Sequence, residues 1–256
     1  MDGSDNRLDH GMVRVRGGTE LRPYEMRFVR PSELDALFSL HQAIVARLDH
    51  PHVFRPDSKA FMAKHIDERG RTVGTFVDRQ MVAYAAISFP DDDPDNLGRD
   101  LPLPPEEYRH VADYDGSAVH PDFRGNKLQL RMTDMRHRYA LVHDRYHILG
   151  TVSPYNAFSL ANFLALGCRV KNIKRKYGDM IRLIIHCDLH EAASPPFEPG
   201  SFREMDLVEI DAIARLLAQG FHGFRVAFNN GRPSLCLGRP LPARRGVAAV
   251  GIEDVA

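Results

Sequence analysis

Three features are scarce in this sequence, and each absence excludes a class of protein. The chain has 3 cysteines, far apart, which gives neither a disulfide framework nor the paired ligand spacing of a zinc site. No apolar run reaches the ~18–20 residues that a membrane-spanning helix needs, and the first residues lack the apolar core of a signal peptide. The formal net charge is +0, so the overall charge indicates neither nucleic acid nor an anionic membrane as a partner.

These absences predict a cytoplasmic protein in a reducing compartment. At 256 residues the chain can hold one large domain, or one domain with a small appendage. Its apolar and charged fractions, 43% and 27%, are those of an ordinary globular protein. Composition thus sets only the class of protein, and the function must be inferred from motifs.

The most informative stretch covers residues 114–129, YDGSAVHPDFRGNKLQ. It predicts a short strand, a turn that contains Gly125, and the start of a helix over 128–143. Backbone N–H groups at a helix start have no intrahelical partner, and together with the helix dipole they favour a phosphate or pyrophosphate group. Arg124 and Lys127 add positive charge at the same place, so this loop is a candidate anion site.

The loop is neither of two familiar phosphate-binding motifs, because a P-loop ends in Gly-Lys-Ser/Thr and a dinucleotide fingerprint needs three glycines. It resembles instead the acyl-CoA loop of the GCN5-related N-acetyltransferases (GNAT), Arg/Gln-x-x-Gly-x-Gly/Ala after a strand that ends in Ala-Val-x-Pro. Residues 118–121 (AVHP) and 124–126 (RGN) match that pattern. Lys127 stands where the family usually has its second glycine, and Gln129 where it has Gly or Ala.

A second stretch, at the right distance along the chain, strengthens the resemblance. Residues 153–168 (SPYNAFSLANFLALGC) resemble the later family helix, which begins at an Asn that contacts the pantetheine arm and ends in Leu-Gly-Phe. Asn156 and the Leu-Gly pair at 166–167 fall in step with that pattern. One predicted helix and one predicted strand separate the two motifs, and the resemblance covers about residues 26–189.

The resemblance implies an α/β (α+β) fold, with a mixed, mainly antiparallel central sheet flanked by helices, and acetyl-CoA or another acyl-CoA as co-substrate. The expected organisation is a flexible N-terminal arm (1–23), a GNAT-like catalytic domain (24–190), a linker (191–200) and a small C-terminal α+β extension (201–256). The residues expected to bind the cofactor are Ala118, Val119, Arg124, Gly125, Asn126, Lys127, Leu128, Gln129, Asn156, Ser159 and Phe163.

Periodicity predicts the remaining elements. Strands are expected at 26–30, 72–78, 81–89, 110–119, 147–152, 169–177 and 182–189, and helices at 32–48, 58–69, 128–143, within 153–168 and at 206–219. A hairpin is expected from 221–228 and 234–237. Because the extension has few core positions, we expect it to pack on the main domain or on another subunit.

Two charged stretches each allow two interpretations. Residues 90–107 are acidic and rich in proline, and form either a functional lid or an unordered surface loop. The acidic part, 91–100, would attract a cationic amine if it lay near the pocket mouth. The basic run at 169–177 indicates either a contact with nucleic acid or, as we favour, a solvated strand edge that Lys protects from pairing.

Acyl transfer to an amine needs a general base within hydrogen-bond reach of the amine. Asp113 and Asp115, on the strand before the loop, are the main candidates, and His110 and His120 are further ones. Period-two alternation puts the two aspartates on one face of that strand and Tyr114 on the other. The alternative is that both aspartates only bind surface water or cap a turn.

The general acid is where the sequence departs from the family. Many relatives have a Tyr seven residues after the Asn of the second motif, and that position here is Phe163, which cannot donate a proton. Tyr155 or Tyr177 could replace it if its side chain faces the sulfur. Alternatively solvent protonates the thiolate, because a thiol of pKa ~8.5 leaves readily.

No metal site is expected. His143 and His147 have the spacing of a metal-binding pair on a helix. The helix should end between them, however, and His147 should open the next strand, so the two rings would not share a face.

The sequence therefore predicts an acyl-CoA-dependent N-acetyltransferase that acts by direct attack of a primary amine of a small molecule or peptide. The alternative is a non-catalytic acyl-CoA-binding or regulatory module of the same fold, suggested by Phe163 and Lys127. Neither nucleic acid nor a membrane is expected as a partner, and the resemblance leaves a homodimer open.

Overall fold

The computed structural model describes residues 7–48, 50, 52–191, 196–229 and 231–241. Its strands are β1 (Arg7–Arg14), β2 (Leu21–Phe28), β3 (Gly70–Val77), β4 (Gln80–Ser88), β5 (Val111–Val119), β6 (His147–Val152), β7 (Arg169–Lys176), β8 (Met180–Asp188), β9 (Arg203–Asp206), β10 (His222–Asn229) and β11 (Arg232–Gly238). Its helices are α1 (Leu34–Val45), α2 (Lys59–Asp67), α3 (Leu128–Leu141), α4 (Ala157–Ala165) and α5 (Ile210–Ala218), with 3₁₀ turns η1 (Pro31–Glu33), η2 (Leu97–Asp100), η3 (Pro105–His110) and η4 (Pro121–Phe123).

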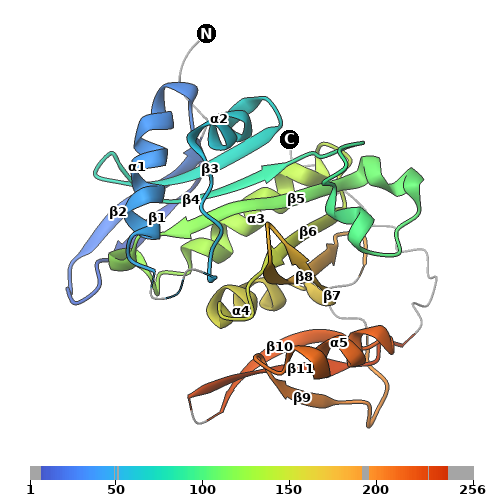
Figure 1. The fold of residues 1–256 in the computed structure, drawn as a ribbon. Coiled ribbons are helices and arrows are strands. Elements are labelled where there is room, and N and C mark those ends of the chain that lie inside the picture. The colour runs from blue at the N-terminus through green and yellow to red at the C-terminus, as the bar shows by residue number, and fades with distance from the viewer. Residues whose placement is uncertain (1–6, 49, 51, 192–195, 230, 242–256) are drawn as a thin grey trace, which may run out of the picture.

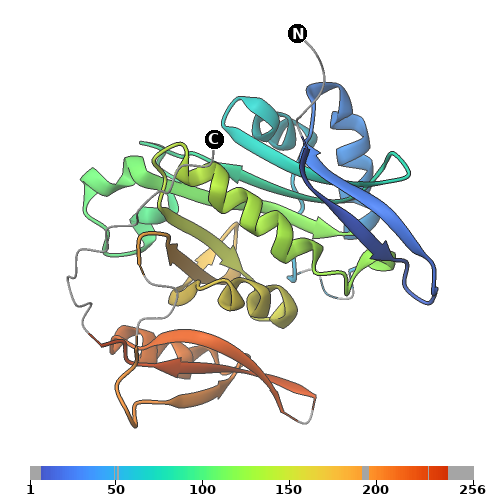
Figure 2. The same cartoon turned by 180° about the vertical axis from the view of Figure 1, so that it is seen from behind.

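The described strands form one sheet in the order β1-β2-β3-β4-β5-β6-β8-β7-β10-β11-β9. Within this part of the chain, β5 and β6 are the parallel pair and the other neighbours are antiparallel. Helices α1 and α2 cover one face and α3 and α4 the other, as the two opposite views show (Figures 1 and 2). The expected mixed, mainly antiparallel sheet flanked by helices is confirmed.

The core lies on both faces of the central strands. Residues 82–87 of β4 are apolar and all buried, because a strand with helices on both faces has no solvent side. On one face the apolar stripes of α1 and α2 pack over Tyr84, through Leu37, Leu40, Ile44, Met62 and Ile66. On the other face Leu128 and Met132 of α3 pack on β2, β3 and β4.

Residues 7–14, expected in a flexible arm, instead form strand β1. β1 pairs antiparallel with β2, which begins at Leu21 rather than near Met26. The stretch has little apolar alternation, with Val13 buried near its end, and Pro23 inside β2 argues against a strand. Backbone pairing with β2 holds this hairpin together, so the pattern of its side chains does not predict it. Residues 1–6 lie outside the described part.

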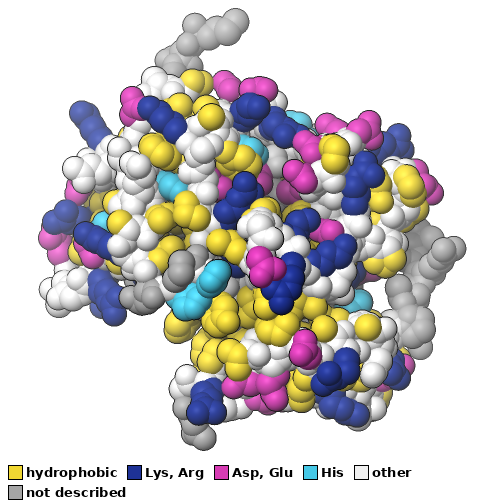
Figure 3. All heavy atoms as spheres, in the orientation of Figure 1, with side chains coloured by type: hydrophobic (Ala, Val, Ile, Leu, Met, Phe, Trp, Pro, Cys, Tyr) yellow, Lys and Arg dark blue, Asp and Glu magenta, His cyan; other side chains and the backbone are white. Residues whose placement is uncertain are grey.

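The C-terminal extension packs on the main domain, which is one of the two arrangements expected. β10 pairs with β7 at Gly223 and Val170. Apolar residues of the extension lie in one core cluster with residues of β6, β7, β8 and α4, and these are Leu207, Ile213, Leu217, Phe221, Val226, Leu235 and Leu237. Hydrophobic side chains also gather on the surface along this junction (Figure 3).

The helix of the extension is shorter than the expected 206–219. Residues 203–206 pair with β11 as strand β9, so the helix α5 starts at Ile210, with Glu209 rather than Asp206 as its N-cap residue. The expected turn at 229–231 joins β10 to β11, with Asn230 itself outside the described residues, as are the linker residues 192–195 and the tail 242–256.

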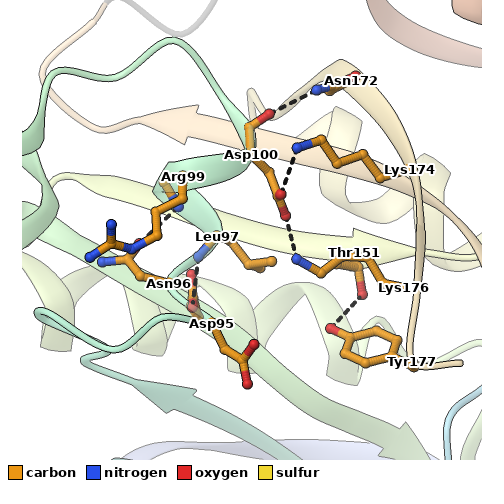
Figure 4. A network of polar contacts seen from close by, with 12 residues as sticks. Asp95, Asn96, Leu97, Arg99, Asp100, Thr151, Asn172, Lys174, Lys176 and Tyr177 are labelled. Carbon is orange, nitrogen blue, oxygen red and sulfur yellow. Dashed lines mark hydrogen bonds and ion pairs between the residues drawn. The ribbon is translucent and has the colours of Figure 1, made fainter.

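The acidic loop at 90–107 folds back onto the sheet as the two turns η2 and η3. Asp100 of η2 points at two lysines of β7 (Figure 4): it accepts a hydrogen bond from Lys174 at 2.8 Å and pairs with Lys176. Further ion pairs join Asp91 to Arg145 at 2.6 Å and Asp93 to Arg69. The acidic and basic runs therefore partly neutralise each other, which leaves less charge to attract a cationic substrate than composition suggested.

Within the described residues, no helix is long and apolar enough to cross a membrane.

Histidines at the junction with the extension are held neutral. Burial and the charges of Lys171 and Arg169 lower the pKa of His222 to about 4, and burial lowers the pKa of His186 well below its usual value. Below about pH 6.5 these two histidines thus bind protons in the unfolded chain more readily than in the folded protein. The stability that these groups contribute is present above about pH 6.5 and is lost as the pH falls toward 4.

We predict that His222→Asn makes stability less dependent on pH. Between about pH 7 and pH 4.5 the variant should lose about 1–2 kcal/mol less of its unfolding free energy than the wild type, as measured by urea denaturation. His143→Asn, at an exposed position after α3, controls for the loss of a histidine as such. Parallel pH profiles for His222→Asn and the wild type would contradict the prediction.

Candidate active site

A cleft opens where β5 and β6 part. The two strands pair in parallel over Val111–Tyr114 and His147–Gly150, and beyond these residues β5 stays with β4 while β6 stays with β8. The cleft has about 740 Å³ of free space when its open mouth is counted. Its lining comes from β5, β6, β8, α4, the start of α2 with the segment before it, and the start of the β7–β8 turn.

A β-bulge directs β5 at this point. Asp115 and Gly116 of β5 stand opposite a single residue of β4, Ala86. Bulges increase the local twist and re-aim side chains. Residues 115–119 remain paired to β4 around the bulge, and their other edge faces the cleft without a strand partner in the described part of the chain. This open backbone edge includes Ala118 and Val119, two of the residues expected to bind the cofactor.

The base of the cleft is packed by aromatic rings. Tyr114 crosses Gly150 so closely that a Cβ there would lie 3.1 Å from the tyrosine side chain, which explains the glycine. The Tyr114 ring also contacts Phe163 of α4, with centroids 4.9 Å apart, and the buried Arg136 lies 4.4 Å from its centroid. Tyr114 therefore points to the α3 and α4 face of the sheet.

The predicted acyl-CoA loop lies at the start of α3. Gly125 has φ +88°, and nothing lies within 4 Å of a Cβ added to it. Lys127, the N-cap residue of α3, also has a left-handed backbone with φ 58°. Leu128 is buried in the core, so only its backbone can serve a ligand. Because the first N–H groups of a helix lack intrahelical partners, this helix start can hold an anion.

The side chain of Asn126 is used by the fold. It donates to the Arg14 carbonyl at 2.8 Å and to the Phe123 carbonyl at 3.0 Å, and accepts from the Arg14 N–H at 2.9 Å. Nearby, Arg124 Nε donates to the Val119 carbonyl at 3.3 Å. β1 thus supports the loop from outside, a role that the sequence did not indicate.

Gln129 connects the two motifs. Its Nε2 donates to Ser159 Oγ at 2.9 Å, and its Oε1 accepts from Asn162 Nδ2 at 2.8 Å. The Gln129 amide thereby bridges α3 and α4. The GNAT loop pattern has Gly or Ala at this position, neither of which could form such a bridge. On α4, Asn156 Oδ1 accepts from the Ser159 N–H at 3.2 Å and caps the helix, and Asn156, Ser159 and Phe163 all line the cleft.

On the opposite face of the sheet, two carboxylates and a histidine converge. Asp115 Oδ2 lies 3.2 Å from His65 Nε2, and His65 Nδ1 lies 2.6 Å from the Phe61 carbonyl. Since Nδ1 must donate to that carbonyl, a proton on Nε2 as well makes the ring an imidazolium that Asp115 stabilises. Asp57 lies against the bulge, where a Cβ on Gly116 would be 2.6 Å from its Oδ2.

The charges of this group are coupled. Burial raises the pKa of Asp57, with a further contribution from the charge of Asp115, to about 6. Burial lowers the pKa of His65, but the contact with Asp115 outweighs it and the net shift is upward. Sequence reasoning missed Asp57 and His65 as site residues. In the sequence, Asp57 is marked only by its position just before the N-cap residue Ser58, and His65 only by its place on the buried stripe of α2.

Asp113 lies outside the cleft lining, although it shares with Asp115 the face of β5 that was expected. It is buried beneath η2, where its Oδ2 lies 3.5 Å from the Leu97 N–H. Burial, with a contribution from the charge of Asp115, raises its pKa well above the usual value. Because it is buried and outside the cleft lining, Asp113 cannot reach an amine bound there, and we assign it to the core.

The two candidate tyrosines differ in position. Tyr155 is 52% exposed and stacks on His50, with ring centroids 4.6 Å apart, outside the cleft lining. Tyr177 lines the cleft, and its hydroxyl lies 3.4 Å from Thr151 Oγ1 (Figure 4). Of the two, Tyr177 is therefore the proton donor that the geometry favours.

No group of His, Cys, Asp and Glu side chains in the described residues is arranged to hold a metal ion.

Neither a protein-family model nor a protein of curated function matches the chain in sequence. The fold, by contrast, matches many solved structures. An acetyltransferase of the GNAT family from Streptococcus pneumoniae superposes with a TM-score of 0.52, over 65% of this chain and 99% of its own, at 13% identity. The ribosomal-protein-S18-alanine N-acetyltransferase from Escherichia coli is 17% identical, with 68% of this chain and 99% of its own covered and a TM-score of 0.49.

A third match is yncA from Salmonella typhimurium, solved with its cofactor acetyl-CoA. It is 15% identical, with 68% of this chain and 98% of its own covered and a TM-score of 0.48. The S. pneumoniae superposition shows that this chain has the GNAT fold. The S. pneumoniae neighbour is an acetyltransferase of that family.

We predict that the raised pKa of Asp57 depends in part on Asp115. In carboxyl-carbon NMR titrations, Asp57 should titrate near pH 6 in the wild type and at lower pH in Asp115→Asn, because that variant removes the neighbouring negative charge. Asp35→Asn, an exposed aspartate on α1, is the control. An unchanged Asp57 titration in Asp115→Asn would show that the two carboxylates are not coupled.

Proposed function

We propose that the protein is an acetyl-CoA-dependent N-acetyltransferase that acts by direct attack of a primary amine of a small molecule or peptide. One observation carries the proposal: at the parting of β5 and β6 the cleft is lined by Asp57 and Asp115 and by the start of α4, where Ser159 accepts a hydrogen bond from Gln129 of the helix start that would hold the pyrophosphate. Donor and acceptor can thus meet in this cleft. The S. pneumoniae acetyltransferase of the GNAT family supports the same class.

The donor would enter from the α3 and α4 face. Backbone N–H groups of residues 124–129 would hold the pyrophosphate, aided by the charges of Arg124 and Lys127. The open edge of β5 would bond to the pantetheine amides and polarise the thioester carbonyl, with Asn156 and Ser159 beside it. Donors fixed in this way, where negative charge develops, are usually the largest catalytic contribution.

The acceptor would enter from the α1 and α2 face. The amine nitrogen forms a bond to the thioester carbonyl carbon as the carbon–sulfur bond breaks, and the proton lost by the nitrogen passes to Asp57. The thiolate takes a proton from Tyr177 or from solvent. With a pKa of about 6, Asp57 is ionised at neutral pH and is a better base than an ordinary aspartate.

A non-catalytic acyl-CoA-binding or regulatory module is the second candidate. It is favoured by Phe163, which lines the cleft where many proteins of the resembling family have a proton-donating tyrosine. The module would bind acetyl-CoA without turnover.

Binding of acetyl-CoA tests the donor site that both candidates share. Calorimetry should give micromolar affinity for the wild type and a loss of about 10²-fold or more for Gly125→Glu, whose carboxylate would repel the pyrophosphate. Gly220→Glu is a matched control, since Gly220 has a similar φ of +84° and similarly open surroundings. The absence of binding by the wild type would exclude both candidates.

Turnover separates the two candidates. Thiol release with a panel of amines should rise with pH through about 6, as Asp57 ionises. Asp57→Asn should lose that rise and lower kcat/KM about 10²-fold, because a positioned base is removed. Asp35→Asn should retain both. Acetyl-CoA binding without release of thiol for any amine would establish the non-catalytic module.

A further inference from the structure

The cleft contains a cation whose charge the fold does not pair. Two arginines line it, Arg55 and Arg182. Arg182 is buried and donates to the His52 carbonyl at 2.8 Å, so it holds the segment before α2 in place. Arg55 is exposed, and no hydrogen bond or ion pair to a described residue engages its guanidinium.

Aromatic rings hold the Arg55 guanidinium in place. Its Cζ lies 4.5 Å from the centroid of Tyr177 and 5.9 Å from that of Phe61. Contacts of this kind orient the planar group through cation–π attraction and leave its N–H donors free. A guanidinium so placed can form two parallel hydrogen bonds to a carboxylate. Tyr177 and Phe61 line the same cleft, so the free donors are within reach of a molecule bound there.

The same segment carries the candidate base. Arg55 and Asp57 are separated by Pro56, which fixes its own φ and favours an extended backbone at Arg55. Residues two apart on an extended backbone point to the same side, and Arg55 and Asp57 both line the cleft, so they can hold the carboxylate and the amine of one amino acid. Arg55 also lowers the pKa of Asp57 by its charge, so the two groups lie within electrostatic range.

We propose that the acceptor is a free amino acid, with its amine at Asp57 and its carboxylate bound by Arg55. The inference rests on the proposed acetyl transfer. The product would be an N-acetyl amino acid and free CoA, with the amine proton taken by Asp57. Phe54 and Phe61 line the cleft near these groups, so the site favours an apolar amino-acid side chain. A peptide amino terminus has an amide in place of the carboxylate and would leave Arg55 unpaired.

The test compares amino acids with their amides, which differ in that one charge. The probes are leucine against leucinamide and phenylalanine against phenylalaninamide, each with acetyl-CoA in a thiol-release assay. The free acid should exceed its amide in kcat/KM about 30-fold or more, mostly through KM. The α-amine of an amino-acid amide is less basic than that of the free acid, so a larger fraction of it is neutral at pH 7.5. The acyl-transfer step alone would therefore favour the amide over the free acid.

Variants at Arg55 locate the recognition. Arg55→Gln should abolish the preference for the free acids over their amides and keep acetyl-CoA affinity, while Arg55→Lys should retain part of the preference. Arg239→Gln is a matched control, because Arg239 lies 5.0 Å from the Phe221 ring centroid in the C-terminal extension. Equal turnover of acids and amides by the wild type, or a preference that survives Arg55→Gln, would overturn the inference.

Failure of the proposed function is a separate outcome. If no amine is acetylated, binding of leucine and leucinamide to the protein–CoA complex is measured by saturation-transfer NMR. Binding of leucine alone, abolished by Arg55→Gln, would support the carboxylate site even though acetyl transfer is wrong. Equal binding of the two, or none, would reject the site.

Discussion

The parting of β5 from β6 is the constraint on which the rest of this structure depends. Each strand remains bonded to an outer neighbour, β5 to β4 and β6 to β8, so the gap costs only the hydrogen bonds that the two inner edges would have made with each other. Unpaired backbone groups are costly when they are buried away from water. The open edge of β5 is therefore either solvated or bonded to a ligand, and a chain molecule with amide groups can replace the missing strand. The bulge at Asp115 and Gly116 and the close contact of Tyr114 with Gly150 set where the gap begins.

The gap also explains how three aspartates coexist near one strand. Asp113, still in the paired part of β5, is buried, and burial raises its pKa well above the usual value. Asp115, at the bulge, has its Oδ2 atom 3.2 Å from His65 Nε2. Asp57, brought in by the segment before α2, has a pKa of about 6, because burial and the charge of Asp115 both oppose its ionisation. Position along the gap thus gives the three carboxyls different surroundings, and Asp57 combines access to the cleft with a raised pKa.

Much of the fold was predictable because local signals agreed with it. The continuous apolar run of β4, the stripes of α1 and α3 and the Gly125 turn each fix an element without distant contacts. β1 was missed because it is held by backbone pairing and by hydrogen bonds between Arg14 and Asn126, residues 112 positions apart. The same limit applies to the site. The loop and Asn156 carry a motif, whereas Asp57, His65 and Arg55 meet the cleft only through tertiary packing, and the Gln129 bridge depends on how α3 and α4 approach each other.

The central claim, that the cleft admits acetyl-CoA along the open edge of β5, is tested most directly by hydrogen–deuterium exchange with and without acetyl-CoA. We expect slower exchange in residues 115–131 and 153–160, which form the β5 edge, the loop and the start of α4. Exchange in residues 203–238 of the extension should be unchanged. Protection confined to other regions, for example the separate groove lined by Arg69, Tyr139 and His143, or no protection at saturating acetyl-CoA, would contradict it.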